Sequence, residues 1–367
     1  MTDIDITPSD FRDLLLEGRP LIDTRAPCEF AKGSPPSAIN LPLMDDSERA
    51  AVGLCYKQEG PDAAIALGHR LVSGERRAAR IDAWKAFAEK HPNGALFCFR
   101  GGMRSQIVQQ WMAEAGVDYP RIEGGYKALR RWSIEQIERI AASADILLIA
   151  GRTGSGKTEF INHAFKGEPI PGSVDLEGLA HHRGSAFGKL PGGQPAQITF
   201  ELAVAIALVG AEHHRPIILE DESRLIGRCA LPPVLQEAMA RAPVMVLDSS
   251  LEARIEHSYH NYIVDNLAAF EQLSGDPVQA WTAFSTQLID AIKAIRKRLG
   301  GVQYDRLSQM IQNALDHHQR GDPTHHRLWI GELLTHYYDP MYNYQLEKKG
   351  GRVIFTGDYN ALAARLC

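Results

Sequence analysis

An apolar run joins a glycine-rich loop in the stretch Asp145-Ile146-Leu147-Leu148-Ile149-Ala150-Gly151-Arg152-Thr153-Gly154-Ser155-Gly156-Lys157-Thr158. The run has the length of a buried strand, and the loop satisfies the phosphate-binding pattern Gly-x4-Gly-Lys-Thr. In this pattern backbone amides wrap phosphate oxygens, the lysine reaches the outer phosphate, and the threonine hydroxyl can hold Mg²⁺. The stretch therefore predicts a strand, a phosphate-binding loop and a helix of an α/β domain.

All eight loop residues are predicted to bind phosphate: Gly151, Arg152, Thr153, Gly154, Ser155, Gly156, Lys157 and Thr158. A second apolar run, 216–219, ends in Glu220-Asp221-Glu222, where Asp221 is expected to hold a metal ion through water. No guanine-selecting Asn/Thr-Lys-x-Asp motif follows, which argues against a GTPase. A small-molecule kinase would use the same loop with mobile arginines, and Arg254 fits that scheme.

A second loop lies about fifty residues upstream, where the apolar run 95–97 leads into Cys98-Phe99-Arg100-Gly101-Gly102-Met103-Arg104. A helix is predicted from Ser105 to Ala115. The amides of such a turn and of the following helix N-terminus stabilise a thiolate and hold an anion. We therefore expect Cys98 to be a nucleophile within an anion cradle, whose members are Arg100, Gly101, Gly102, Met103 and Arg104.

The segment before this loop resembles the first signature of rhodanese domains. An Asp-x-Arg sequence at 23–25 is followed by Ala-Ile-Asn-x-Pro at 38–42. The usual Gly-His-Ile-Pro-Gly-Ala is replaced by Gly-Ser-Pro-Pro-Ser-Ala at 33–38, and the stretch from Met44 to Arg80 is longer than a simple rhodanese needs. Phosphatases with a Cys-x5-Arg loop lack this context. Cys28 is expected to be a packed side chain.

The predicted fold class is α/β with two domains. An N-terminal rhodanese-like parallel-sheet domain spans 7–131, and a helical linker spans 132–144. A P-loop NTPase-like α/β domain then spans 145–367, with further strands at 216–219, 244–247 and 352–355 and a helical pattern from about residue 250.

Composition places the chain among ordinary globular proteins. It has 367 residues, 44% hydrophobic and 23% charged, with a net charge of −5 and no apolar run long enough for a bilayer. Five scattered cysteines and an acidic start without a signal peptide predict a cytoplasmic protein without disulfides. The histidines come mostly as adjacent pairs, which do not share one face of a helix or strand, so no metal site is predicted.

The stretch Val174-Asp175-Leu176-Glu177-Gly178-Leu179-Ala180-His181-His182-Arg183-Gly184-Ser185-Ala186-Phe187-Gly188 mixes charge, histidine and glycine in a way that core packing does not require. With both loops, with 220–227 and with the tyrosine-rich 337–342, it closely resembles the bacterial tRNA 2-selenouridine synthase family. The resemblance covers nearly the whole chain. The substrate-binding candidates are Asp175, Glu177, His182, Arg183, Gly184, Ser185, Asp221, Glu222, Ser223 and Arg224.

The resemblance implies an enzyme, a transferase acting on the wobble uridine of tRNA. Members of the family replace the sulfur of 2-thiouridine with selenium from selenophosphate, and are linked to an S-geranylated intermediate made from geranyl diphosphate. By position, Cys98 would carry selenium and residues 151–158 would be the P-loop. The implied partners are tRNA, selenophosphate and geranyl diphosphate, with the selenophosphate-producing enzyme as a further candidate. No bound prosthetic group is expected.

These observations lead to a hypothesis of divided labour: the P-loop domain binds geranyl diphosphate and the cysteine loop handles selenium. The alternative is a rhodanese-type sulfurtransferase fused to an ATP-dependent kinase or ATPase. A third reading is a non-catalytic tRNA-binding module, against which the intact Cys98 and Lys157 argue. The basic segment Lys293–Arg298 is the best candidate for contact with the tRNA backbone.

Overall fold

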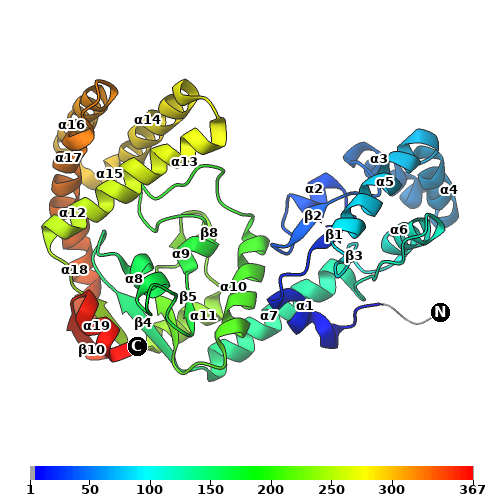
Figure 1. Ribbon diagram of the computed structural model, residues 1–367, viewed down its shortest axis with the longest axis horizontal. Coiled ribbons are helices and arrows are strands. Elements are labelled where there is room, and N and C mark those ends of the chain that lie inside the picture. The colour runs from blue at the N-terminus through cyan, green and yellow to red at the C-terminus, as the bar shows by residue number, and fades with distance from the viewer. Residues whose placement is uncertain (1–4, 367) are drawn as a thin grey trace. The chain divides into compact units, whose positions relative to one another are not determined.

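The computed structural model describes residues 5–366, which divide into two compact units. Unit 1 comprises Met1–Arg139 and Ala196–Gly210, and unit 2 comprises Ile140–Pro195 and Ala211–Cys367. Each unit contains its own parallel sheet (Figure 1).

Unit 1 is built around short parallel strands in the order β2-β1-β3. Isolated parallel bridges extend this sheet from Leu96 to Arg121 and from Ile122 to Ile6. Its elements are η1 (Pro8–Asp10), α1 (Phe11–Leu16), β1 (Leu21–Asp23), α2 (Pro27–Phe30), β2 (Ala38–Asn40), α3 (Asp46–Glu59), α4 (Pro61–Leu71), α5 (Gly74–Lys90), β3 (Ala95–Phe97) and α6 (Met103–Glu114).

Unit 2 contains a parallel sheet in the order β10-β9-β4-β6-β5, and the phosphate-binding loop follows its middle strand. The sheet part contains β4 (Ile146–Ala150), α8 (Lys157–His163), β5 (Ser173–Val174), α9 (Leu176–Leu179), β6 (Ile217–Glu220), β7 (Leu225–Ile226), β8 (Cys229–Ala230), α11 (Pro233–Arg241), β9 (Val244–Leu247), β10 (Val353–Gly357) and α19 (Tyr359–Leu366). Every residue of β4, β6 and β9 is buried, which explains their continuous apolar sequences.

The helical part of unit 2 has a hydrophobic core of its own, which includes Phe284, Ile311 and Trp329. Its helices form a layer beside the sheet-containing part (Figure 1). They are α12 (Leu251–Tyr259), η2 (His260–Val264), α13 (Asp265–Ser274), α14 (Pro277–Ala294), α15 (Arg296–Leu299), α16 (Gly301–Gln319), η3 (Pro323–His325), α17 (His326–Leu333), η4 (Leu334–Tyr338), α18 (Asp339–Lys348) and η5 (Gly350–Arg352).

The units differ from the predicted domains in two places. The predicted linker, 132–144, is the second half of one helix, α7 (Gly125–Ser143). Most of α10 (Gln197–Ala211) belongs to unit 1, although it lies within the predicted second domain. The reason is packing, because Ile198 and Ile206 of α10 contact the unit 1 core around Phe11.

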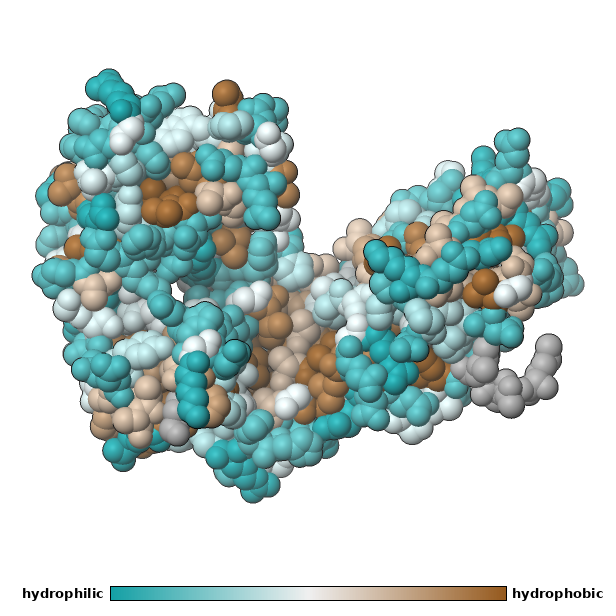
Figure 2. Space-filling view, viewed as in Figure 1, coloured by the Kyte–Doolittle hydropathy of each residue, from teal (hydrophilic) through white to brown (hydrophobic). Residues whose placement is uncertain are grey.

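The predicted strands at 21–23, 95–97 and 244–247 and the helix after Cys98 are confirmed. The mixed α/β class with parallel sheets and a helical C-terminal part is also confirmed. Within residues 5–366, no helix is long and apolar enough to cross a bilayer. On the face that Figure 2 shows, each unit is mostly hydrophilic with scattered hydrophobic residues.

Candidate functional site

The phosphate-binding loop of unit 2 connects β4 to the N-terminus of α8. It lines a pocket of about 780 Å³. The loop residues that line it are Gly151, Thr153, Gly154, Ser155, Gly156, Lys157 and Thr158. The other predicted residues that line it are Glu177, His182, Arg183, Gly184, Ser185, Asp221, Glu222 and Ser223. Most of the residues singled out in three separate stretches of sequence therefore meet at one cavity.

Two carboxyl groups surround the hydroxyl of Thr158 at the floor of this pocket. The hydroxyl donates to Glu220 over 2.5 Å, and Glu177 Oε2 lies 3.0 Å from the same oxygen. The amide of Glu177 donates to the other oxygen of Glu220 over 3.0 Å. Glu220 ends β6 and Glu177 lies in α9, so parallel strand β6 and the short helix after β5 bring both groups to the loop.

Burial is the main cause that raises the pKa of Glu177 and of Glu220, and the negative charge of neighbouring carboxyls adds to it. Burial also raises the pKa of Glu222 to about 7. Burial opposes the ammonium form of Lys157, but the charges of Glu222, Glu177 and Glu220 outweigh it and raise the pKa of the lysine. A carboxyl group with a pKa near neutrality can exchange a proton at physiological pH. The pocket thus combines a loop of the phosphate-binding pattern with carboxyl groups whose pKa is raised.

Several buried polar atoms around the pocket have no hydrogen-bond partner among the described residues. They are Ser155 Oγ, His182 Nδ1, Arg183 Nη1, Ser258 Oγ and Tyr342 Oη. An unpaired buried polar atom costs free energy, so such a concentration around one cavity indicates a polar ligand. Burial lowers the pKa of His182 to about 4, and this side chain is therefore neutral at pH 7.

Gly184 shows why the loop after α9 needs glycine. Its φ is +44°, and a Cβ there would lie 2.2 Å from Glu177 Oε1 and 3.1 Å from Glu222 Oε2. Any side chain would push these two carboxyl groups away from Lys157. The glycine therefore sets the close approach of this loop to the acidic floor of the pocket.

Three predicted residues do not line the pocket. Arg152 lies on the loop but donates to Asn343 over 3.3 Å. Asp175 caps α9 by accepting from the amide of Gly178, and it also accepts from Asn162. Arg224 is exposed, and its carbonyl accepts from the amide of Leu231.

Asp221, which we expected to hold a metal ion, is already paired with another side chain. Asp221 forms an ion pair with Lys349, whereas its neighbour Glu220 contacts Thr158. Asp221 lies just beyond the end of β6 and still lines the pocket, but of these two adjacent acids it is Glu220 that contacts the threonine of the loop. The sequence shows the acidic cluster but not which member faces the threonine.

Arg254 is not a mobile arginine. It is 1% exposed, pairs with Asp339 over 2.5 Å, and donates through Nε to the carbonyl of Thr153 over 2.9 Å. These contacts fix the guanidinium on the back of the phosphate-binding loop. The contacts do not favour the mobile, kinase-like arginine that the sequence allowed, and they connect Arg254 to the backbone of the loop.

The sequence analysis also missed residues from the helical part of unit 2. His257, Asn261, Tyr262 and Tyr342 line the pocket. Tyr262 Oη accepts a hydrogen bond of 2.9 Å from Ser185. The nearest signal was the tyrosine-rich segment 337–342, to which Tyr342 belongs and which carried part of the family resemblance. Tyr338 of that segment is buried in the helical core, and Tyr344 is exposed.

The cysteine loop of unit 1 connects β3 to α6. Cys98 is 3% exposed, and its sulfur lies 3.2 Å from Ser105 Oγ and 3.8 Å from the carbonyl of Gly102, at the N-terminus of α6. Gly101 has φ of +63°, and a Cβ there would lie 2.7 Å from the amide nitrogen of Gly124. The loop is thus tightly backed by 122–125, and its glycine cannot be replaced without movement.

The two arginines of this loop have different environments. Arg100 is exposed, whereas Arg104 pairs with Glu29 over 2.7 Å. Glu29 also contacts Arg49 over 3.1 Å. Burial opposes ionisation of Glu29, but the hydrogen bond and charge of Arg104 outweigh it and lower the pKa of that carboxyl. Of these two arginines, Arg100 is therefore the one without an acidic partner among the described residues.

The Asp-x-Arg segment supports the loop from behind. Asp23 and Arg25 form a buried ion pair of 2.5 Å, and Thr24 donates to the carbonyl of Phe97 over 2.8 Å. The side-chain amide of Asn40 donates to the carbonyls of Asp23 and Arg25. These residues tie the ends of β1, β2 and β3 together. Cys28, expected to be packed, is exposed.

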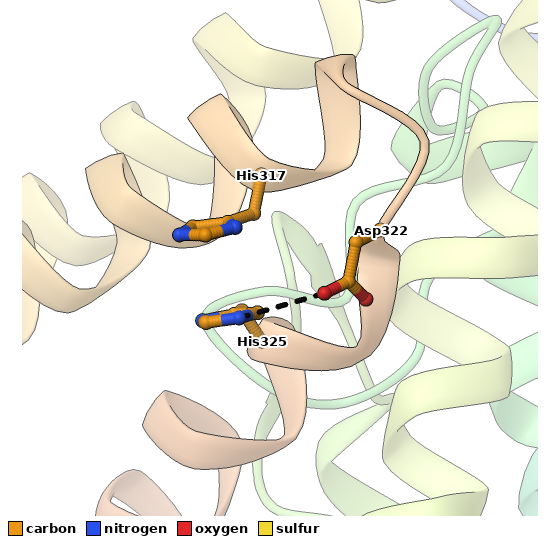
Figure 3. Close-up of side chains that lie close together, drawn as sticks. All are labelled: His317, Asp322 and His325. Carbon is orange, nitrogen blue, oxygen red and sulfur yellow. Dashed lines mark ion pairs between the residues drawn. The ribbon is translucent and has the colours of Figure 1, made fainter.

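His317, Asp322 and His325 offer ligand atoms within 4.8 Å of one another, and these residues come from two different histidine pairs (Figure 3). The sequence argument considered each pair alone and so missed this juxtaposition. The two imidazole rings are stacked, with centroids 3.7 Å apart and planes 6° apart. His325 Nε2 lies 3.5 Å from Asp322. Parallel rings direct their nitrogens alongside one another and not toward one point, so we assign no metal here.

Comparison with known proteins gives the family. A family model described as the tRNA 2-selenouridine synthase AAA domain matches residues 144–366. A tRNA 2-selenouridine synthase from Hahella chejuensis is 52% identical over 356 residues, covering 96% of this chain and 92% of that protein. The chain belongs to the tRNA 2-selenouridine synthase family.

Other members of the tRNA 2-selenouridine synthase family are similar over comparable lengths. The protein from Marinobacter nauticus is 49% identical and covers 95% of this chain and 94% of its own. The protein from Cupriavidus pinatubonensis is 51% identical and covers 96% of each. The family that the sequence motifs predicted is thereby confirmed, and the similarity extends across both units.

Proposed function

We propose that this enzyme converts the wobble 2-thiouridine of tRNA to 2-selenouridine with selenophosphate, through S-geranyl-2-thiouridine made from geranyl diphosphate. The observation that carries the proposal is the presence of two complete loops in one chain that is similar to tRNA 2-selenouridine synthases along its length. One loop lines a polar pocket with unpaired donors, and the other presents a cysteine at a helix N-terminus.

In the first step, the sulfur of 2-thiouridine attacks the carbon that carries the diphosphate. The carbon–oxygen bond breaks, diphosphate leaves, and the base loses its N3 proton. Lys157 and the amides of residues 151–158 would bind the departing charge, and Arg183, whose Nη1 lacks a partner, would add to it. Glu222, with a pKa of about 7, is our candidate for accepting the proton.

The floor of this pocket fits Mg²⁺. Thr158, Glu220 and Glu177 place oxygen donors together, and oxygen is the donor that Mg²⁺ prefers. Burial and the charge of neighbouring carboxyls raise the pKa of both groups, and a bound cation would oppose that rise. Thr158 and Glu220 are the residues that would hold the ion. When bound, it would neutralise part of the diphosphate charge.

In the second step, selenium replaces the alkylated sulfur at C2. The net reaction consumes selenophosphate and water and releases geranylthiol and phosphate, so no external oxidant or reductant is required. Alkylation matters because geranylthiolate is a better leaving group than sulfide. We place this step at the cysteine loop, where the Cys98 thiolate attacks C2 and displaces geranylthiolate. Selenium from selenophosphate then displaces Cys98 from C2 while water takes up the phosphoryl group, and Arg100 offers positive charge for the anionic donor.

We further infer that unit 1 is rhodanese-like. Its parallel strands, the Asp23–Arg25 pair, Asn40 and the cysteine loop support this reading. For the alternative, a sulfurtransferase joined to an ATP-dependent kinase, the fixed Arg254 removes one expected feature. Turnover of ATP that does not respond to geranyl diphosphate would favour that alternative. The cytoplasmic location stays a prediction.

The proposal is tested by nucleoside mass spectrometry of tRNA after incubation with each donor separately. Geranyl diphosphate alone should yield S-geranyl-2-thiouridine, and selenophosphate should then convert it to 2-selenouridine. Formation of 2-selenouridine from 2-thiouridine without any geranyl donor would contradict the proposed order of steps.

A further inference from the structure

Unit 1 contains an apolar pocket that neither step described above uses. Its volume is about 160 Å³, roughly a fifth of that of the phosphate pocket, so it suits a narrow chain better than a nucleotide. Residues that form its floor are nearly fully buried, and they include Leu43, Met44, Ala64, Val72 and Trp111.

The pocket exists because α3 and α4 pack loosely over the rest of unit 1. These two helices belong to the 44–80 stretch that exceeds the length of a simple rhodanese. The 25 residues of the two helices (14 and 11) contribute only Glu48, Cys55 and Ala64 to the buried set. Protein cores are normally close-packed, and an apolar cavity that persists tends to bind apolar molecules.

The pocket adjoins the cysteine loop. Met103 and Arg104 line it, and both belong to the predicted anion cradle of Cys98. Met103 is 51% exposed and Phe99 of the same loop is 37% exposed, so apolar surface continues from the pocket rim onto the loop. Hydrophobic residues are also visible on the surface over these helices (Figure 2). A ligand in the pocket would thus lie beside the residues that surround the sulfur.

We propose that this pocket holds the isoprenoid chain of S-geranyl-2-thiouridine while the cysteine loop acts on C2 of the same base. The inference rests on the proposed function, because that function supplies the alkylated base. The chain is attached to the sulfur that leaves C2, so its first carbon lies two bonds from the reacting carbon when that sulfur is displaced. The apolar pocket beside the cysteine loop meets this requirement.

The site also explains how the enzyme would select the alkylated base over unmodified 2-thiouridine at this step. Each methylene that leaves water for an apolar pocket gains about 0.8 kcal/mol, which corresponds to about fourfold in binding. A longer alkyl chain should therefore react with a higher kcat/KM, until the pocket is full. Positive charge at Arg104 is compensated by Glu29, which leaves this rim of the pocket compatible with an uncharged chain.

The test uses variants in which a larger side chain fills the pocket, and it compares their rates on substrates with different S-alkyl groups. Anticodon stem-loops carrying S-geranyl-2-thiouridine or S-methyl-2-thiouridine are incubated with selenophosphate, and 2-selenouridine is measured by mass spectrometry. Ala64→Phe places a ring in the pocket from α4, and Ala66→Phe adds the same ring to an exposed position of that helix. Ala64→Phe should lower kcat/KM for the geranyl substrate at least tenfold, with little change for the methyl substrate. Ala66→Phe should change neither.

Val52→Phe, which fills the pocket from α3, guards against a folding defect in Ala64→Phe. Both variants should still convert the S-methyl substrate at the wild-type rate, which verifies that the cysteine loop of unit 1 is folded. If wild type and both variants convert the geranyl substrate equally well, the pocket assignment is wrong and the proposed function stands. Wild-type enzyme that does not convert the geranyl substrate at all would overturn the proposed function and the pocket assignment with it.

Discussion

The hydroxyl of Thr158 donates a hydrogen bond of 2.5 Å to Glu220, the last residue of β6. This contact identifies Glu220 as the acid that binds the threonine of the phosphate-binding loop. The adjacent Asp221 instead forms an ion pair with Lys349. The two acids are adjacent at the end of β6, and they have different partners: Thr158 for Glu220 and Lys349 for Asp221.

Glu220→Gln should therefore abolish the response of the enzyme to Mg²⁺ and diphosphate. A ligand present at about 100 times its Kd stabilises the folded state by about 2.7 kcal/mol, which raises Tm by several degrees. We expect that rise for wild-type enzyme with MgCl₂ and inorganic diphosphate in a thermal-melt assay. Asp221→Asn is the matched control and should keep the rise. If Asp221→Asn loses it and Glu220→Gln retains it, the assignment is wrong.

Arg254→Met should lower the free energy of unfolding by about 3–5 kcal/mol, because it leaves the partner of a buried ion pair without its counter-charge and frees the carbonyl of Thr153. Denaturant titration measures this loss. Arg327→Met, which breaks the more exposed pair with Glu256, serves as control and should have a small effect. Reduced activity of Arg254→Met with unchanged stability would instead indicate an arginine that acts directly on substrate.

The enzyme should lose stability on acidification through His326 of α17. This side chain is fully buried, and burial, followed by the charges of His318 and His325, lowers its pKa to about 3. A base whose pKa is lowered by folding stabilises the protein above its unfolded pKa of about 6.5, and this contribution is lost as pH falls toward 3. Between pH 6.5 and 5 the loss amounts to about 2 kcal/mol.

His326→Gln removes this titration while keeping an acceptor for Trp329, which donates to His326 Nδ1 over 3.0 Å. Unfolding free energies of both proteins are to be measured from pH 7 to 4.5. The variant should show a shallower decline than wild type. Parallel curves for the two proteins would show that His326 does not contribute.

Lys297→Glu should weaken tRNA binding, because Arg296, Lys297 and Arg298 form an exposed basic turn in α15. Loss of one phosphate contact reduces the slope of log K against log salt by about one. Filter binding at several salt concentrations measures it. Lys90→Glu, at the exposed end of α5, is the control. Equal effects of the two reversals would mean that the basic turn of α15 is not a specific contact.

Local sequence patterns predicted both loops and the strands before them, because the residues that form each of these features are continuous in sequence. The loops at 98–104 and 151–158 are continuous in sequence, and each follows a buried strand whose apolar run is visible. The Asp175–Gly188 stretch has a composition that packing alone does not require, and Glu177 and Arg183 do line the phosphate pocket.

The remaining features depend on contacts between distant segments, which no local pattern encodes. Arg254 is fixed by Asp339, 85 residues later, so its sequence neighbourhood could not show that it is immobile. Which of Glu220 and Asp221 contacts Thr158 depends on distant partners, because the amide of Glu177 holds Glu220 and Lys349 pairs with Asp221. The packing of α10 with unit 1 depends on which apolar face Ile198 and Ile206 meet.

The central claim is that the two loops carry out separate steps, and Lys157→Ala tests it most directly. The measurement is the amount of 2-selenouridine that this variant forms from tRNA already carrying S-geranyl-2-thiouridine, with selenophosphate as donor. We predict yields close to wild type, together with no geranylation of 2-thiouridine. Cys98→Ser should show the opposite pattern and accumulate geranylated tRNA, with the exposed Cys28→Ser as its control. Equal loss of both steps in Lys157→Ala would contradict the division of labour.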